Sequence, residues 1–269
     1  MERHYELAIW AGSDRGRVRP RNEDAFAVWL DPVQDAAPPP EGWLEVGARG
    51  VLLAVADGMG GLEEGELAAR SALAGLHDHF QGLAREELPK GDAARDHLRH
   101  AFRASQERVV RLARATGKEV GTTLVAAWVL GSLTHLAWCG DSRAYAWHPA
   151  DGLARLTKDH SLVQAWVEEG RLSPEEAFDH PYGNIVTRFL GNPNYPSEPE
   201  AHTLPLRDGL CLLLCSDGLN AVLRDAEIEN LLAPHTSPAD AGRALLEEVL
   251  RRGAPDNVTL VLAKFRGKS

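Results

Sequence analysis

Cysteine and long hydrophobic runs are both scarce in this sequence, and each shortage excludes a class of protein. Only three of the 269 residues are cysteines, Cys139, Cys211 and Cys215, and each lies in an apolar segment. An odd number of cysteines in such positions is typical of reduced core thiols, so we expect neither a disulfide framework nor a zinc site. The N-terminus lacks the apolar segment of a signal peptide, and the longest apolar runs are far shorter than the ~20 residues that span a bilayer. These features predict a cytoplasmic protein without a membrane partner.

Positive charge is the third shortage. The chain has 29 lysines and arginines against 39 aspartates and glutamates, which gives a net charge of −10. A protein that binds nucleic acid through its phosphates needs the opposite balance or a basic stripe, and the sequence has neither, so we expect no nucleic-acid partner. An acidic total can serve solubility, or it can reflect carboxylates that gather around bound cations. The positions of the carboxylates, and not their number, distinguish these two interpretations.

The remaining composition is ordinary for a globular chain, with 44% hydrophobic and 25% charged residues. No repeat with a period of about 20–50 residues is visible, which makes one domain over residues 1–269 the simplest organisation. Residues 35–50 include Pro38, Pro39 and Pro40 and predict a surface insertion. Residues 159–190 are polar and weakly patterned, and they predict a helical flap over a site.

Apolar runs rich in β-branched residues predict strands at residues 25–30, 51–56, 123–130, 133–139, 144–147, 210–215 and 258–263. Helices are predicted at residues 61–83, 92–116 and 238–252, with Ser237 or Asp240 as the capping candidate of the last. Short turns at residues 130–132 and 140–143 connect consecutive strands and predict antiparallel pairing at both places. Because the helices fall between groups of strands, the pattern favours an α+β architecture over a doubly wound parallel sheet.

Acidic residues stand at the ends of the predicted strands. Strand ends are followed by Asp57-Gly58, Asp141 and Asp217-Gly218, and strand starts are preceded by Glu23-Asp24 and Asp256. In an antiparallel sheet, the exit of one strand lies beside the entry of its neighbour, so these side chains can meet at one edge. Each Asp-Gly pair taken alone is better explained as turn chemistry than as a metal ligand.

Several carboxylates at one edge are harder to explain as turns, because like charges a few ångströms apart destabilise a fold unless something neutralises them. Hard divalent cations with oxygen ligands, Mn²⁺ or Mg²⁺, are the usual partners of such a cluster. Gly58 fits this interpretation because it lets a backbone carbonyl approach an ion. A site of this kind suits metal-assisted hydrolysis with two ions. Arg19 is the candidate to bind a phosphate group bidentately, although it is also a plausible surface arginine.

Eight segments, taken in order, resemble the protein phosphatase 2C family of metal-dependent serine/threonine phosphatases. They are SDRGRVRPRNED (13–24), ADGMGG (56–61), GTT (121–123), GDSR (140–143), LTKDHS (156–161), VTRFLG (186–191), SDGL (216–219) and DNVT (256–259). The resemblance runs from about residue 7 to residue 263. It implies a four-layer sandwich of two antiparallel β-sheets flanked by helices, with metals at one end.

The resemblance also implies a role for each acidic residue at the strand ends. Asp57 would bridge two core metal ions, Mn²⁺ or Mg²⁺, with help from the Gly58 carbonyl. Asp217 and Asp256 would complete the shell of one ion, and Glu23 would serve the other. Asp141 with Asp217 would hold a third, weaker ion. Arg19 would bind the substrate phosphate, and Asp24 would lie beside the site.

The implied activity is hydrolysis of phosphoserine and phosphothreonine in proteins by direct attack of a metal-bridging hydroxide, without a phosphoenzyme. The implied partners are phosphorylated protein substrates and a serine/threonine kinase or its targets. A non-catalytic phosphoprotein-binding member of the same fold is the alternative. One departure concerns Met59, which stands where eukaryotic members often carry a histidine proposed as general acid. Methionine has no proton to donate, so a metal-bound water is the first candidate for that role and His160 the second.

Overall fold

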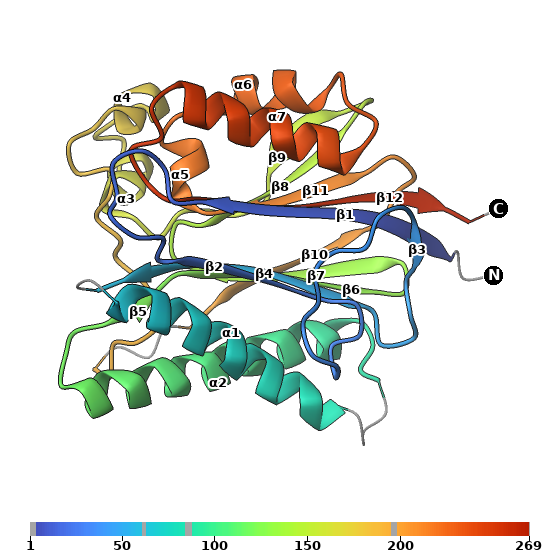
Figure 1. Cartoon of the computed structure of the whole chain (residues 1–269), viewed down its shortest axis with the longest axis horizontal. Helices are drawn as coiled ribbons and strands as arrows, with labels where there is room; N and C mark the ends of the chain where they lie inside the picture. The colour runs from blue at the N-terminus through green and yellow to red at the C-terminus, as the bar shows by residue number, and fades with distance from the viewer. Residues whose placement is uncertain (1–3, 61–62, 84–87, 195–197, 269) are drawn as a thin grey trace.

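Two antiparallel β-sheets lie face to face, and helices cover both outer surfaces (Figure 1). The computed structural model describes residues 4–60, 63–83, 88–194 and 198–268. The first sheet contains, in spatial order, β3 (Leu44–Glu45), β1 (Tyr5–Asp14), β12 (Val258–Gly267), β11 (Cys211–Cys215), β8 (Arg143–His148) and β9 (Gly152–Arg155). The second contains β10 (Glu200–Pro205), β7 (Leu133–Cys139), β6 (Leu124–Leu130), β4 (Val51–Met59) and β2 (Asp24–Trp29), with β5 (Gly121–Thr122) paired to β4.

The helices form the two outer layers. The second sheet is covered by α1 (Glu64–Gly82) and α2 (Asp92–Thr116), and the first by α6 (Asp225–Leu232) and α7 (Pro238–Arg251) (Figure 1). Three short helices lie towards one end of the sheets: α3 (Leu162–Glu168), α4 (Pro174–Phe178) and α5 (Asp217–Asn220). Among the helices of the described ranges, none combines the length and apolar character that a membrane crossing requires. The expected α+β sandwich of four layers is confirmed.

The strand β4 shows how the layers follow from the sequence. Its even-numbered residues from Leu52 to Ala56 pack with Phe80 and Phe102 of the helices, and its odd-numbered residues from Val51 to Val55 pack between the sheets. A third cluster lies between the first sheet and α6 and α7. Because side chains alternate across a strand, a central strand of a four-layer fold buries both faces and is apolar at every position. This explains why β4 was easy to predict.

Most predicted elements are confirmed within a few residues, and Cys139, Cys211 and Cys215 are buried as expected. The side chain of Ser237 accepts hydrogen bonds from the backbone N–H groups of Ala239 and Asp240 and so caps α7. The predicted start of α1 at Gly61 lies outside the described residues. The short strands β3, β5 and β9 were not predicted, and neither were β1 and β10, in which polar residues interrupt the apolar pattern.

One predicted strand pairing is wrong. The turn at residues 130–132 does join the antiparallel pair β6 and β7, in which Leu130 lies opposite Leu133. The turn at residues 140–143 instead carries the chain from one sheet to the other, because β7 pairs with β6 and β10, whereas β8 pairs with β11 and β9. Gly140 permits this crossing. Its φ is +118°, and a Cβ there would lie 2.5 Å from the Thr123 side chain.

The predicted insertion and flap both contain regular structure. In the insertion, β3 extends the first sheet, with Glu45 opposite Glu6 of β1. The flap segment contains α3 and α4, and its base is held by a bidentate pair in which Arg143 Nη2 lies 2.6 Å from Asp159 Oδ2. Residues 35–50 are therefore part of the sheet edge as well as the surface.

Candidate active site

The central pair of carboxylates is set by strand register. Asp24 at the start of β2 lies directly opposite Asp57 of β4. Opposite residues of an antiparallel pair project from the same face with Cβ atoms about 5 Å apart, and like charges in that position repel. Asp24 is only 7% exposed. The sheet thus forces two carboxyl groups together in a largely water-free place.

Asp24 is held by a hydroxyl group from the other sheet. Ser216 Oγ donates a 2.7 Å hydrogen bond to Asp24 Oδ2 and accepts one of 2.9 Å from the Thr259 backbone N–H. The second oxygen, Asp24 Oδ1, is buried and has no hydrogen-bond partner among the described residues. Burial, together with the charges of Asp217 and Asp256, raises the pKa of Asp24 to about 7, against the lowering effect of the Ser216 hydrogen bond.

Asp57 is the carboxylate on which the others converge. Burial and the charges of Asp24, Asp217, Asp141 and Asp256, in that order, raise its pKa well above the ordinary value. Its backbone is fixed by a threonine pair, because the Asp57 N–H donates to Thr123 Oγ1 at 3.0 Å and the Asp57 carbonyl accepts from Thr123 N–H and Thr122 Oγ1, each at 2.9 Å. Residues from four separate segments therefore act on one side chain.

Asp217 and Asp141 lie on the side of the site nearer the first sheet. Burial and the charge of Asp256 raise the pKa of Asp217 to about 6, and its Oδ1 atom is buried without a hydrogen-bond partner among the described residues. Burial and the charges of Asp217 and Asp159 raise the pKa of Asp141 well above its ordinary value. Asp141 is 5% exposed, in the turn that crosses between the sheets.

Arg19 lies at the rim of this cluster. Its Nη2 atom is 2.6 Å from Asp256 Oδ2, and the side chains are 50% and 28% exposed. The pKa of Arg19 is raised, first by this hydrogen bond and also by the charges of Asp217 and Asp57. The structure thus brings Arg19, the predicted phosphate-binding residue, close to the predicted metal ligands. It also pairs Arg19 with one of them, Asp256.

Glu23 is positioned by close backbone contacts. The Gly58 N–H donates to the Glu23 carbonyl at 3.2 Å, and the Glu23 N–H donates to Asn257 Oδ1 at 2.8 Å. A Cβ on Gly65 would lie 2.7 Å from the Glu23 carboxyl carbon, and one on Gly58 would lie 2.0 Å from the Gly65 carbonyl oxygen. Glycine is required at both positions because the start of α1 presses against the Glu23 side chain. Burial raises the pKa of Glu23 above its ordinary value.

Three side chains that support the site were not predicted from the sequence. Asn257 accepts from the Glu23 N–H and donates to the carbonyls of Arg15 and Arg21, both at 2.8 Å, so it organises the loop that carries Arg19. Ser216 and Thr123 hold Asp24 and Asp57 as described above. Ser216 and Asn257 carry a weak signal in the sequence, because each is adjacent to an aspartate and to a buried strand. Thr123 has only its position at the start of a predicted strand, and its contact with Asp57 is visible only in the structure.

His160 does not face the cluster with a free nitrogen. The Gly140 N–H donates to its Nδ1 atom at 3.0 Å, and its Nε2 atom lies 3.1 Å from Glu200 Oε1. It is 6% exposed, and burial lowers its pKa. Both ring nitrogens are therefore engaged in holding the base of the flap.

The donor chemistry of the cluster fits a hard divalent cation. Two buried carboxylate oxygens lack a partner among the described residues, and the mutual raising of the pKa values is the electrostatic strain that a cation would relieve. In the described ranges, no three acidic, histidine or cysteine side chains already stand as a complete ligand group. One reason is that the guanidinium group of Arg19 is paired with Asp256, a carboxylate that an ion would need as a ligand.

An α+β sandwich with oxygen-donor side chains gathered at one end of its sheets has the architecture of a metal-dependent hydrolase. The model of the protein phosphatase 2C family matches residues 31–264. The chain belongs to this family.

Several relatives have been studied. The serine/threonine protein phosphatase PstP of Mycobacterium tuberculosis is 38% identical over 261 residues, which cover 96% of this chain and 45% of that protein. The chain therefore spans less than half the length of that relative. The serine/threonine phosphatase stp of Listeria innocua is 31% identical and is covered over 93% of its length, against 94% of this chain.

Solved structures agree with the fold. A crystal structure of the Mycobacterium tuberculosis phosphatase PstP/Ppp superposes with a TM-score of 0.79 at 35% identity, over 96% of this chain and 98% of that one. A second structure is that of a PstP catalytic domain in complex with two manganese ions. It has a TM-score of 0.77 at 34% identity and covers 97% of this chain and 99% of that one.

Proposed function

We propose that this protein is a metal-dependent serine/threonine protein phosphatase that hydrolyses phosphoserine and phosphothreonine in other proteins. The observation that carries the proposal is the convergence of Asp24, Asp141, Asp217 and Asp256 on Asp57, with Arg19 at the rim. Family membership supports it, because the relatives with the same domain are named serine/threonine phosphatases. The physiological substrates are expected to be targets of a serine/threonine kinase.

The residues that would hold Mn²⁺ or Mg²⁺ are Glu23, Asp57, the Gly58 carbonyl, Asp217 and Asp256, with Asp141 and Asp217 available for a third ion. When bound, such ions supply Lewis-acid activation of water and of the phosphoryl group. The protein's own contribution is to keep these oxygens together against their repulsion. Two buried networks do this: Ser216 holds Asp24, and Thr122 and Thr123 hold Asp57.

Arg19 would bind the substrate phosphate. Its guanidinium group is half exposed and already lies beside the carboxylates. A phosphate group offers the same bidentate geometry as a carboxylate and carries more charge, so it can replace Asp256 as the partner of Arg19. Release of Asp256 would then couple substrate binding to completion of the ligand group.

We also propose a cytoplasmic location and a single phosphatase domain over residues 1–269, with residues 159–190 as a flap. The location is supported by the buried thiols of Cys211 and Cys215. The single domain is supported by the apolar cluster that the two sheets share.

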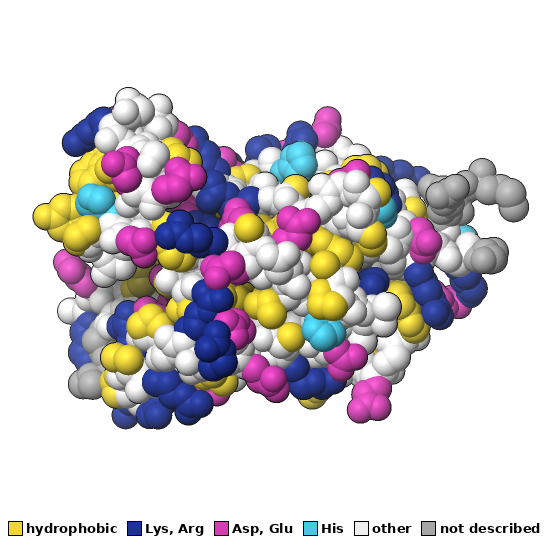
Figure 2. Space-filling model, turned by 90° about the horizontal axis from the view of Figure 1, so that it is seen from above, with side chains coloured by type: hydrophobic (Ala, Val, Ile, Leu, Met, Phe, Trp, Pro, Cys, Tyr) yellow, Lys and Arg dark blue, Asp and Glu magenta, His cyan; other side chains and the backbone are white. Residues whose placement is uncertain are grey.

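On the face shown in Figure 2, basic side chains are interspersed with acidic ones. That distribution differs from the basic stripe that a nucleic-acid surface requires.

The purified protein with Mn²⁺ tests the proposal directly. We expect phosphate release from a phosphothreonine peptide that depends on Mn²⁺ and stops with a chelator. A roughly hundredfold preference for free nucleotides over the peptide would overturn the assignment to protein substrates. Peptide binding without phosphate release, at saturating Mn²⁺, would instead identify the non-catalytic binding module.

A further inference from the structure

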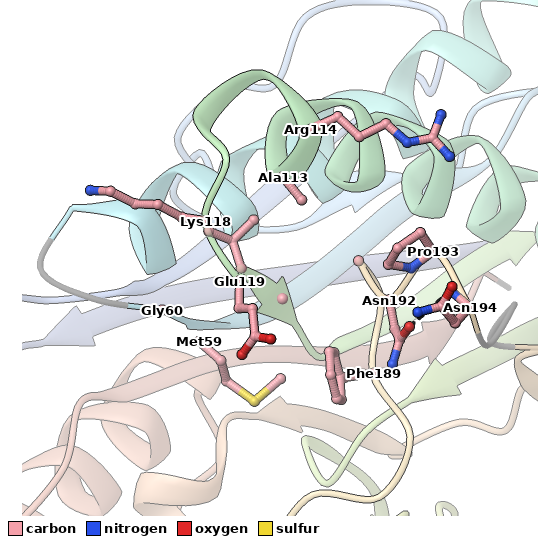
Figure 3. A pocket seen from close by; sticks show the side chains of 13 residues that line it. Met59, Gly60, Ala113, Arg114, Lys118, Glu119, Phe189, Asn192, Pro193 and Asn194 are labelled. Atoms are coloured by element: carbon pink, nitrogen blue, oxygen red, sulfur yellow. Dashed lines mark hydrogen bonds between the residues drawn. The ribbon is translucent and has the colours of Figure 1, made fainter.

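A cavity of about 540 Å³ lies at the end of β4, the strand that carries Asp57 (Figure 3). Met59 and Gly60 at the end of β4 form one side of it. The turn after α2 and residues 189–194, which include the end of the flap segment, form the others. Much of its lining is apolar, with Met59, Val120 and Phe189 contributing side chains. A cavity of this size accommodates an amino-acid side chain several times over.

Backbone pairing ties this cavity to the candidate active site. Met59 lies opposite Gly121 where β4 pairs with β5. Thr122 of β5 pairs in turn with Leu190, through backbone hydrogen bonds of 2.8 and 2.9 Å. Met59 follows Asp57 by two residues, a distance of roughly 7 Å along an extended strand. A peptide whose phosphorylated residue lies at Asp57 can therefore place a side chain two to four residues away in the cavity.

The far wall of the cavity is held in place by α2. Gln106 accepts a 2.7 Å hydrogen bond from the Gly191 N–H and donates one of 2.8 Å to the Asn192 carbonyl. Gly191 has a φ of +115°, and a Cβ on it would lie 2.6 Å from the Val120 carbonyl oxygen. A Cβ on Gly121 would lie 2.5 Å from the Phe189 ring. The cavity is thus a built feature of the fold, with its walls fixed by glycines and by one glutamine.

The charge inside the cavity is negative. In Figure 3, Glu119 extends toward Met59, whereas the ends of Lys118 and Arg114 point away from the cavity. Lys118 is also paired with Glu64. Within the described parts of the chain, Glu119 has neither an ion-pair partner nor a hydrogen-bond partner. The cavity therefore presents apolar walls and one unpaired carboxylate.

We propose that this cavity is a specificity subsite for a lysine or arginine of the protein substrate, close in sequence to the phosphorylated residue. The aliphatic stem of such a side chain packs against Met59, Val120 and Phe189, and its charged head pairs with Glu119, as long basic side chains do elsewhere. The proposal rests on the proposed phosphatase function and adds to it a substrate class. Glu119 is a specificity residue and takes no part in phosphate release itself.

The test uses the purified protein with Mn²⁺ and a set of phosphothreonine peptides. The peptides carry arginine, alanine or glutamate at each position from two to four residues on either side of the phosphothreonine. We expect arginine at one of these positions to raise kcat/KM about three- to fivefold over alanine, the effect of a partly exposed ion pair, with glutamate below alanine. Glu119→Gln should abolish the preference, and Glu119→Lys should reverse it.

Two controls separate this inference from the phosphatase function. Glu247→Gln changes a charge on α7, in the opposite outer layer, and should keep the preference of the wild type. Hydrolysis of p-nitrophenyl phosphate, which has no flanking residues, should be the same in wild type and both Glu119 variants.

If wild type hydrolyses the peptides without any preference, or if Glu119→Lys keeps the preference for arginine, the subsite is wrong and the phosphatase function stands. If no peptide is hydrolysed while p-nitrophenyl phosphate is, the assignment to protein substrates fails, and the subsite fails with it.

Discussion

Asp24 and Asp57 lie opposite each other in the register of β2 and β4, so the backbone hydrogen bonds of the second sheet hold two carboxylates in contact range. The pKa values of both are raised by burial and by neighbouring charge. β4 is also paired with β6 on its other side, so the two carboxylates cannot separate unless β2, the edge strand, leaves the sheet. The fold therefore holds two carboxyl groups together although their negative charges repel each other.

Asp57→Asn should remove the carboxylate on which the others converge. We expect phosphatase activity to fall at least about a hundredfold, because changes even to groups outside the ligand shell of a metal cost 10- to 100-fold. Without divalent ions, the same change should raise the melting temperature, since it removes like-charge repulsion worth up to about 1 kcal/mol. Activity assays and thermal melts in a chelator measure the two effects. Activity near that of wild type would refute the central role of Asp57.

Stability without divalent ions should fall as the pH rises from about 4 to 7. The folded-state pKa values of Asp24, about 7, and Asp217, about 6, lie above the ordinary value of a carboxyl group. A raised folded-state pKa means that the folded protein binds more protons than the unfolded chain, so its contribution is full at low pH and is lost as the pH rises through that range. Urea unfolding in a chelator at pH 5 and pH 7.5 measures this. Saturating Mn²⁺ should reduce the difference, and an unchanged midpoint in the chelator would contradict the charge repulsion.

Arg19→Ala should mainly raise KM for phosphopeptides. A hydrogen bond to a charged group contributes about 1.5–3 kcal/mol, so we expect roughly a 10- to 100-fold increase. Arg19→Lys should recover only part of the loss, because lysine cannot bind phosphate bidentately. Steady-state kinetics of the three proteins measure the effect. An unchanged KM in Arg19→Ala would exclude contact with the substrate phosphate.

Gly65→Ala should weaken Mn²⁺ binding without unfolding the protein. The new Cβ would lie 2.7 Å from the Glu23 carboxyl carbon and would displace that side chain. We expect a loss of about 10- to 100-fold in affinity, measured by calorimetric titration.

Gly82→Ala is the matched control, since Gly82 lies in the same helix α1 and a Cβ there meets no described residue within 4 Å. It should leave Mn²⁺ affinity unchanged and stabilise the helix by up to about 1 kcal/mol. Equal effects of the two substitutions would show that Glu23 does not depend on the space at Gly65.

Much of the fold could be predicted from the sequence because central strands such as β4 are buried on both faces and show it as an unbroken apolar run. Among the strands that were missed, β3, β5 and β9 have only two to four residues, and β1 and β10 carry polar residues at partly exposed positions, so their pattern alone does not identify them. The crossing between the sheets at Gly140 was missed for another reason. A four-residue connection is compatible with a hairpin, and only the packing of Thr123 against Gly140 decides otherwise.

The acidic residues of the site could be found because each lies beside an apolar run that predicts a strand, and a glycine adjoins Asp57, Asp141 and Asp217. Their partners could not be found in the same way. Ser216 meets Asp24 across 192 positions of sequence, and the Arg19–Asp256 pair joins residues 237 positions apart. Such contacts depend on how two sheets dock, and no local pattern encodes that docking.

Asp141 lies in the connection from β7 to β8, which crosses from the second sheet to the first at the seam, the boundary between the two sheets. Asp24 and Asp57 belong to one side of that seam, whereas Asp217 and Asp256 flank strands of the other. A cation bound by carboxylates of both groups would link the first sheet to the second. Substitutions deep between the sheets, far from any carboxylate, should therefore change the affinity for the ion by shifting one sheet against the other.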